Sequence, residues 1–224
     1  MAHRALALIA FGALFLAACD SGTDYPTDLG DDEYHLEDMA LRQEDLPAGF
    51  EQTEGFSFSI EEWAEVFGSD DPEATARQLE AQGWLRNWVT ESVPPRFGPT
   101  LNVRSVSTLY NNEQSAKDST EKFACGLPVG LNVQLDPFIV PKLGEQSNGF
   151  FHEEEIDENG TTLMYTTVCF RTGRIVHVVQ QASLPGLEDI RGSLRHARIM
   201  LGHVDDAFEG RGVSSRGDEE EDDG

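Results

Sequence analysis

The sequence is poor in basic residues, and this shortage excludes two classes of partner. Its 224 residues contain 16 Lys and Arg against 41 Asp and Glu, which gives a formal net charge of −25. Nucleic-acid binding requires a basic footprint, and docking on anionic lipid headgroups requires a polybasic patch, so we expect neither. An acidic surface most often serves solubility, and weak association of divalent cations is the functional alternative.

The common signatures of catalysis and cofactor binding are also missing. The sequence has no Gly-x-Ser-x-Gly motif, no P-loop and no Gly-x-Gly-x-x-Gly motif. His152 and Glu154 would share a strand face, but the His-Glu-x-x-His spacing of zinc proteases is absent, so a solvated strand face explains this pair better. His177 lies among valines and is better explained as a sheet-face histidine than as a general base. We therefore predict no catalytic residue, no metal site and no cofactor.

One apolar run is present, near the N-terminus, and it is short for a membrane span. It extends from Ala5 to Ala18 after a basic start at His3 and Arg4, whereas a spanning helix needs about 20 apolar residues. A basic start, an apolar run of this length and small residues at its end are typical of a secretory signal peptide.

The end of this run, Leu16-Ala17-Ala18-Cys19, resembles the lipobox of bacterial lipoproteins. The resemblance implies that residues 1–18 are a signal peptide and that Cys19 carries a diacylglycerol thioether. Each buried methylene contributes about 0.8 kcal/mol, so two or three acyl chains anchor a protein stably. We therefore expect a protein held in the cell membrane by its N-terminal lipid, on the extracytoplasmic face, either periplasmic or at the cell surface.

Cysteine is scarce, and only Cys125 and Cys169 remain once Cys19 is assigned to the lipid. In an oxidising compartment we predict that these two form a disulfide, with two separate buried thiols as the alternative. Closing the loop between them stabilises by about 4 kcal/mol in the chain-entropy model.

Composition divides the chain after the signal peptide into three parts. Residues 19–35 are rich in Asp, Gly, Thr and Pro without an apolar period, which predicts an acidic disordered tether with a reach of about 20 Å. Residues 36–208 carry the periodic patterns of a single globular domain. Residues 209–224 are predicted to be an acidic disordered tail.

Helix caps, turns and apolar periodicity predict the elements of the domain. Apolar residues between Leu187 and Phe208 repeat at spacings of three and four, which indicates an amphipathic helix. The order of elements predicts an α+β fold, an antiparallel sheet with helices packed on it and the C-terminal helix closing the core. The other helices are expected at 59–67, 71–83 and 111–124, and the strands at 84–93, 101–110, 129–136, 149–156, 161–171 and 174–182.

Three segments resemble a known group of proteins. They are Leu-Pro-Ala-Gly-Phe at 46–50, Val-Ser-Thr-Leu-Tyr at 106–110 and Phe-Arg-Thr-Gly-Arg-Ile-Val at 170–176. They are similar to actinobacterial-type lipoproteins and sensor-kinase ectodomains with PsbP-like or LpqN-like folds. The resemblance spans most of residues 41–208 and implies a binding or accessory domain, usually without catalytic residues.

The sequence thus predicts an extracytoplasmic lipoprotein that binds a small ligand or an envelope protein, for sensing or envelope assembly. A structural envelope lipoprotein without a ligand is the alternative, and an envelope hydrolase is less favoured. Some aromatic residues could line an apolar groove, although core packing explains them more simply. These residues are Trp84, Trp88, Phe150, Phe151 and Tyr165.

Overall fold

The computed structural model describes residues 25–67, 71–96, 98–127, 133–156 and 160–210. The predicted signal peptide, the lipidation site Cys19 and the acidic tail beyond Gly210 lie outside these ranges. Within them, no helix combines the length and the apolar character needed to cross a membrane.

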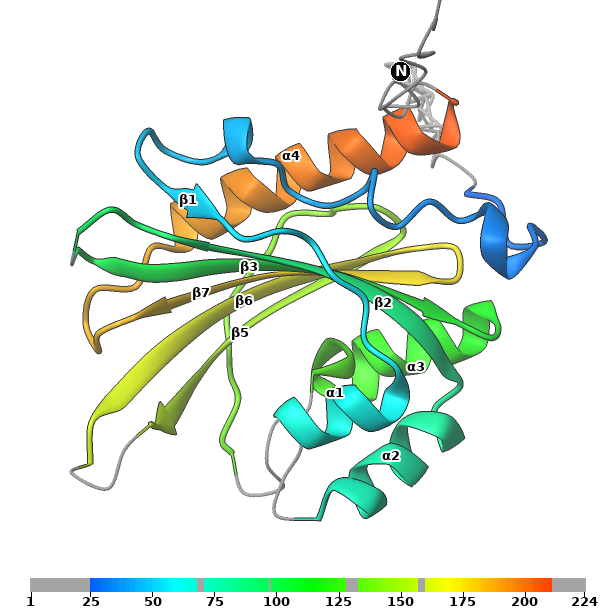
Figure 1. The fold of residues 1–224 in the computed structure, drawn as a ribbon, viewed down its shortest axis with the longest axis horizontal. Coiled ribbons are helices and arrows are strands. Elements are labelled where there is room, and N and C mark those ends of the chain that lie inside the picture. Colours follow the sequence, from blue (N-terminus) through cyan, green and yellow to red (C-terminus); the bar gives the residue numbers. More distant parts are fainter. Residues whose placement is uncertain (1–24, 68–70, 97, 128–132, 157–159, 211–224) are drawn as a thin grey trace, which may run out of the picture.

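A seven-stranded antiparallel sheet forms the middle layer, in the order β1-β2-β3-β7-β6-β5-β4 (Figure 1). The hairpin between β6 and β7 turns at Gly173, whose positive φ of 56° suits a residue without a Cβ atom. The strands are β1 (Glu51–Gln52), β2 (Trp84–Val93), β3 (Thr100–Tyr110), β4 (Asp136–Pro137), β5 (Gln146–Glu155), β6 (Thr162–Thr172) and β7 (Ile175–Ser183).

Helices cover both faces of the sheet, which confirms the predicted α+β fold. In Figure 1 the helices α1 (Ile60–Phe67), α2 (Pro72–Ala81) and α3 (Glu113–Lys122) lie on one face, and α4 (Ile190–Phe208) lies on the other. Short 3-10 turns are η1 (Asp31–Glu33), η2 (Gln43–Asp45) and η3 (Ala124–Gly126).

The caps predicted from the sequence form as expected. Glu62 and Ser59 make the two reciprocal hydrogen bonds of a capping box, at 2.8 and 3.2 Å. Asp71 accepts from the backbone of Ala74 at 2.9 Å and starts α2. Each helix therefore begins where its local sequence satisfies the free N–H groups.

The core is divided by the sheet into two apolar clusters. The cluster on the α4 side contains Tyr34, Leu36, Phe170 and Met200, and the cluster beside α1–α3 contains Trp63, Trp84, Val106, Tyr110 and Cys169, among others. Alternation along each strand sends neighbouring residues to opposite clusters, so Cys169 and Phe170 lie on different faces.

Residues 25–35 are folded against the domain, so the predicted disordered tether is wrong for this part. Tyr34 is only 1% exposed and Tyr25 is 8% exposed, because both aromatic rings pack near Phe208 of α4. Burial of such rings outweighs the entropy that an acidic, glycine-containing stretch gains by remaining disordered. Residues 19–24 lie outside the described part of the chain.

A second difference concerns the strand predicted at 129–136. Residues 128–132 lie outside the described ranges, residues 133–135 are irregular, and β4 covers only Asp136 and Pro137. β4 pairs with Phe150 and Phe151 at the edge of the sheet. A proline cannot donate to a strand ladder, so an edge is where it is tolerated.

Candidate ligand-binding face

The five aromatic residues considered for an apolar groove do not gather on one face, so they do not form that groove together. Trp84 belongs to the cluster beside α1–α3, whereas Trp88 packs against the α4-side cluster. A register shift in β2 between Trp84 and Arg86 causes this separation. Residues four apart in a regular strand share a face, but one bulge reverses the alternation.

Phe150 and Phe151 are likewise separated by the alternation of β5. Phe150 lies in the cluster beside α1–α3, whereas Phe151 packs with its ring 4.8 Å from that of Phe138, on the α4 side. Tyr165 lies on the same face as Phe150, next to a set of polar side chains that the sequence did not single out as a site.

These polar side chains lie in cross-strand register at one end of the sheet. Glu91 of β2 lies opposite Arg104 of β3. Arg104 lies opposite Gln180 of β7, which lies opposite Thr167 of β6. Opposite side chains on one face are about 5 Å apart, so the four residues form a continuous row across the sheet.

A second row runs beside the first, nearer the end of the strands. Asn102 pairs with Ala182, Ala182 with Tyr165, and Tyr165 with His152. In Figure 1 the ends of β3, β7, β6 and β5 that carry these rows extend past α1, α2 and α3. We call this surface the polar face, defined as Glu91, Asn102, Arg104, His152, Tyr165, Thr167 and Gln180.

Hydrogen bonds order the first row, but several of them are long. Glu91 Oε1 accepts from Asn102 Nδ2 at 2.7 Å and from Arg104 Nη2 at 3.4 Å. Arg104 Nη1 reaches Gln180 Oε1 at 3.5 Å, and Gln180 Nε2 reaches Thr167 Oγ1 at 3.4 Å. Strong N–H···O bonds are near 2.9 Å, so the contact between Gln180 and Thr167 is a weak one.

His152, expected from the sequence on a solvated strand face, is instead buried, and it carries a polar atom without a partner within the described ranges. The residue is 6% exposed, its ring stacks on Tyr165 at 4.9 Å, and its Nδ1 hydrogen-bonds to nothing among the described residues. Burial lowers the pKa of His152 to about 4, so the ring is neutral at pH 7. A buried nitrogen without a partner costs about 1–3 kcal/mol, which a ligand that bonds to it would recover.

The remaining groups favour an uncharged ligand. Burial raises the pKa of Tyr165, and the Glu154 carboxylate adds to the shift, so its phenol stays protonated. Arg104 is ion-paired with Glu91 at 3.4 Å. The face therefore offers amide, imidazole and hydroxyl groups beside an aromatic ring, with Arg104 and Glu91 paired and the Glu154 carboxylate close to Tyr165.

The other residues considered from the sequence have structural roles. Cys125 and Cys169 form a disulfide with a Cα–Cα distance of 6.3 Å, and both are buried. His177 is fully buried, with Nδ1 3.0 Å from the hydroxyl of Ser107 and Nε2 2.8 Å from that of Thr172. Both ring nitrogens of His177 are thus engaged, as befits a histidine within the core.

A groove of about 720 Å³ on the other face is a weaker candidate. Residues 35–44, residues 52–55, β2 and the end of α4 line it. Its amides already serve the local structure, because Gln43 Nε2 donates to the Phe50 carbonyl at 2.5 Å and Gln52 Nε2 to that of Leu41 at 2.7 Å. Across the ranges described, no three His, Cys, Asp or Glu residues gather as metal ligands.

One signal in the sequence marks the polar face. At every second residue of β3, the side chains change from Val106 to Arg104 and Asn102, and β7 changes from Val178 to Gln180. A change from apolar to polar on one face, repeated in paired strands, indicates where the helix cover ends. The pairing needed to recognise the repetition comes from the structure.

Comparison with known proteins finds similarity in fold. No protein-family model matches the chain, and no curated protein matches it. The extracellular domain of PknH from Mycobacterium tuberculosis is similar in structure, with a TM-score of 0.52 and 8% sequence identity. The match covers 81% of this chain and 98% of that domain. The chain therefore has a fold that also occurs in the extracellular domain of a mycobacterial protein.

Proposed function

We propose that this protein is a membrane-anchored extracytoplasmic lipoprotein whose α+β domain binds a small ligand at the polar face, as a sensor or envelope accessory module. The observation that carries the proposal is His152. Its Nδ1 is buried and has no hydrogen-bond partner in the described part of the chain, at the end of the second polar row. Buried polar atoms in native proteins are normally satisfied, and a bound ligand is one way to satisfy them.

We propose a saccharide as the ligand class. Ligand sites combine an apolar wall with a few polar groups that fix orientation. Here the half-buried Tyr165 supplies ring surface, whereas Asn102, Gln180 and His152 supply donors and acceptors. A sugar ring presents hydroxyl groups at its rim and C–H groups on its face, which matches this division.

The extracytoplasmic part of the proposal has two supports besides the lipobox resemblance. The Cys125–Cys169 disulfide fits an oxidising compartment. The fold also occurs in a domain described as extracellular. The lipid anchor itself is tested by Cys19→Ser. We expect this variant to leave the membrane fraction, whereas the native protein has the mass of residues 19–224 plus a diacylglyceryl group.

Ligand binding is tested by thermal stabilisation with a panel of soluble mono- and oligosaccharides. A ligand at 100 times its Kd stabilises the folded state by about 2.7 kcal/mol. His152→Leu should weaken binding at least tenfold, whereas the control His35→Leu, an exposed histidine away from the polar face, should bind like the native protein. Equal affinity of the native protein and His152→Leu would refute this site. Absence of any stabilisation would instead favour a structural envelope protein.

A further inference from the structure

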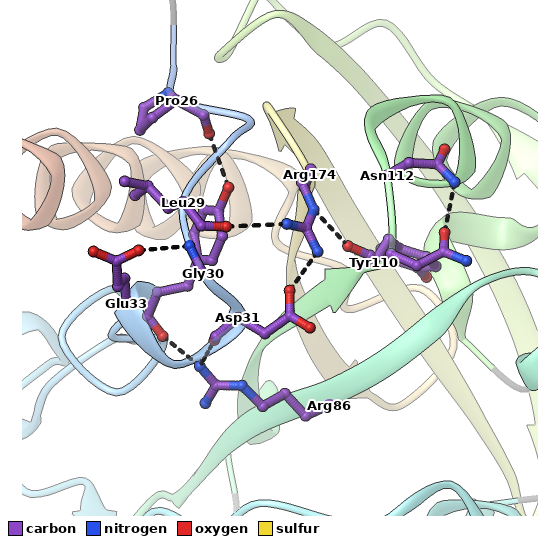
Figure 2. A network of polar contacts seen from close by, with 11 residues as sticks. Pro26, Leu29, Gly30, Asp31, Glu33, Arg86, Tyr110, Asn112 and Arg174 are labelled. Carbon is purple, nitrogen blue, oxygen red and sulfur yellow. Dashed lines mark hydrogen bonds and ion pairs between the residues drawn. The ribbon is translucent and has the colours of Figure 1, made fainter.

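The N-terminal segment is fastened to one end of the sheet by Arg174, at the β6–β7 hairpin. The guanidinium donates from Nη2 to Asp31 Oδ1 at 2.6 Å, from Nη1 to the Leu29 carbonyl at 3.3 Å and from Nε to the Tyr110 carbonyl at 2.9 Å. Figure 2 shows Arg174 between the N-terminal segment and Tyr110. Because the residue is 8% exposed, these contacts are sheltered from water and each is stronger than on an open surface.

Two further contacts hold the same segment. Arg86 of β2 donates to the carbonyls of Asp31 and Tyr34 at 2.6 and 2.7 Å. Tyr25 donates from its hydroxyl to Asp205 of α4 at 2.8 Å. We call residues 25–34, together with Arg86, Arg174 and Asp205, the N-terminal clamp. The clamp ties the segment to three separate elements, which are β2, the β6–β7 hairpin and α4.

The clamp shortens the connection to the lipid. Only five residues, Asp20 to Asp24, separate Cys19 from Tyr25. Six Cα–Cα steps span at most about 22 Å even when fully extended. A tether that ran to residue 35 would have sixteen steps and a maximal span of about 56 Å.

The polar face lies at the opposite end of the strands. β7 starts at Ile175, next to Arg174 of the clamp, and Gln180 of the polar face lies five residues further along it. At about 3.3 Å per residue, that separation is about 17 Å, and the strand end at Ser183 is about 26 Å away.

We infer that the domain rests on the lipid surface with the end of the sheet that carries the clamp, which we call the clamp end. The polar face then points away from the bilayer, toward ligands of the envelope space. The inference rests on the lipid anchor of the proposed function. The surface-exposed residues of the clamp end include Asp31, Asp32 and Glu33. Their charge opposes docking on anionic lipid, so the short covalent connection, and not attraction to the headgroups, keeps this end near the membrane.

Energy transfer to a headgroup-labelled lipid tests this orientation. The lipidated full chain is placed in phosphatidylcholine vesicles with a fluorescent amino acid at Asp32, in the clamp end, or at Leu184, just beyond β7, both of which are exposed. We expect stronger transfer from position 32 than from position 184. Equal transfer from both positions, or stronger transfer from position 184, would overturn the inference.

Two variants and a control separate the clamp from the anchor. Ten Gly/Ser residues inserted before Tyr25 raise the maximal span of the connection from about 22 to about 56 Å, and transfer from position 32 should fall. Arg174→Gln should also lower the transfer from position 32, because it releases the segment. The control Arg77→Gln, which removes an exposed ion pair with Glu73 on α2, should leave the transfer unchanged. Unchanged transfer after the insertion contradicts the inference even if Arg174→Gln does not fold. Failure of the native chain to associate with vesicles at all refutes the anchor, and the inference with it.

Discussion

Reduction of the Cys125–Cys169 disulfide should destabilise the domain by about 2–4 kcal/mol. The bond closes a loop with a sequence separation of 44, for which the chain-entropy model gives about 4 kcal/mol. Ala124 and Cys125 adopt positive φ values of 48° and 63°, and such a conformation costs a non-glycine residue about 1–2 kcal/mol. If Cys125 relaxes to a negative φ after reduction, the reduced protein regains about 1–2 kcal/mol. This gain sets the lower end of the predicted destabilisation.

The assay is urea unfolding of the unlipidated Cys19→Ser chain with and without reductant. Intact mass should confirm a gain of two daltons, so that free thiols are established before stability is compared. Reduction expands the unfolded ensemble, so the dependence of the unfolding free energy on urea should steepen while the midpoint falls. An unchanged midpoint in a fully reduced sample would refute the reasoning, because both sulfurs are buried and their loop is long.

Four further predictions concern stability. His177 has a pKa lowered to about 3 by burial, whereas an unfolded histidine titrates near 6.5. Stability is therefore fully present above about pH 6.5 and falls as the pH drops toward 3. His177→Gln should weaken this dependence in urea titrations by about 1.4 kcal/mol per pH unit. Gly55→Ala should cost about 1–3 kcal/mol by calorimetry, because its Cβ would lie 2.6 Å from the Trp88 ring. Gly202→Ala, on α4 with nothing within 4 Å, should stabilise by up to about 1 kcal/mol. Arg174→Met should cost about 2–3 kcal/mol, because the carbonyls of Leu29 and Tyr110 lose their donor. Limited proteolysis of this variant should then cut within residues 25–34, which the arginine no longer holds.

Local signals were sufficient for most of the fold. Caps such as Asp71 and Asn112 act within one turn, and each places a helix where the sequence predicts it. The rotation of α4 about its own axis, which decides the residues that it buries against the sheet, was less predictable. The spacing of its apolar residues indicated a stripe through Leu194 and Leu201, but the buried residues include His196 and Met200. His196 is accommodated because its Nδ1 lies 2.9 Å from the amide of Gln181, a contact that only the packed structure supplies.

The N-terminal segment was mispredicted because composition is an average. Residues 20–38 contain eight acids and no Lys or Arg, which favours disorder. Two tyrosines decide the outcome instead, since Tyr25 and Tyr34 both pack near Phe208 of α4. The arginines that hold the segment, Arg86 and Arg174, come from distant parts of the chain, and no local pattern connects them to it.

The polar face was missed for a different reason, which also limits where a site can form in this fold. Each strand that carries it also builds the core, so its polar residues resemble ordinary strand ends when one strand is read alone. The rows are continuous because β3, β7 and β6 change from apolar to polar at the same level of the sheet. On the opposite face, the same level of the sheet is covered by α4, where Gln181 Nε2 lies 2.9 Å from His196 Nδ1. The ligand proposed for the polar face would bind where the first row is continuous, so its site depends on the register of three strands and not on any one of them.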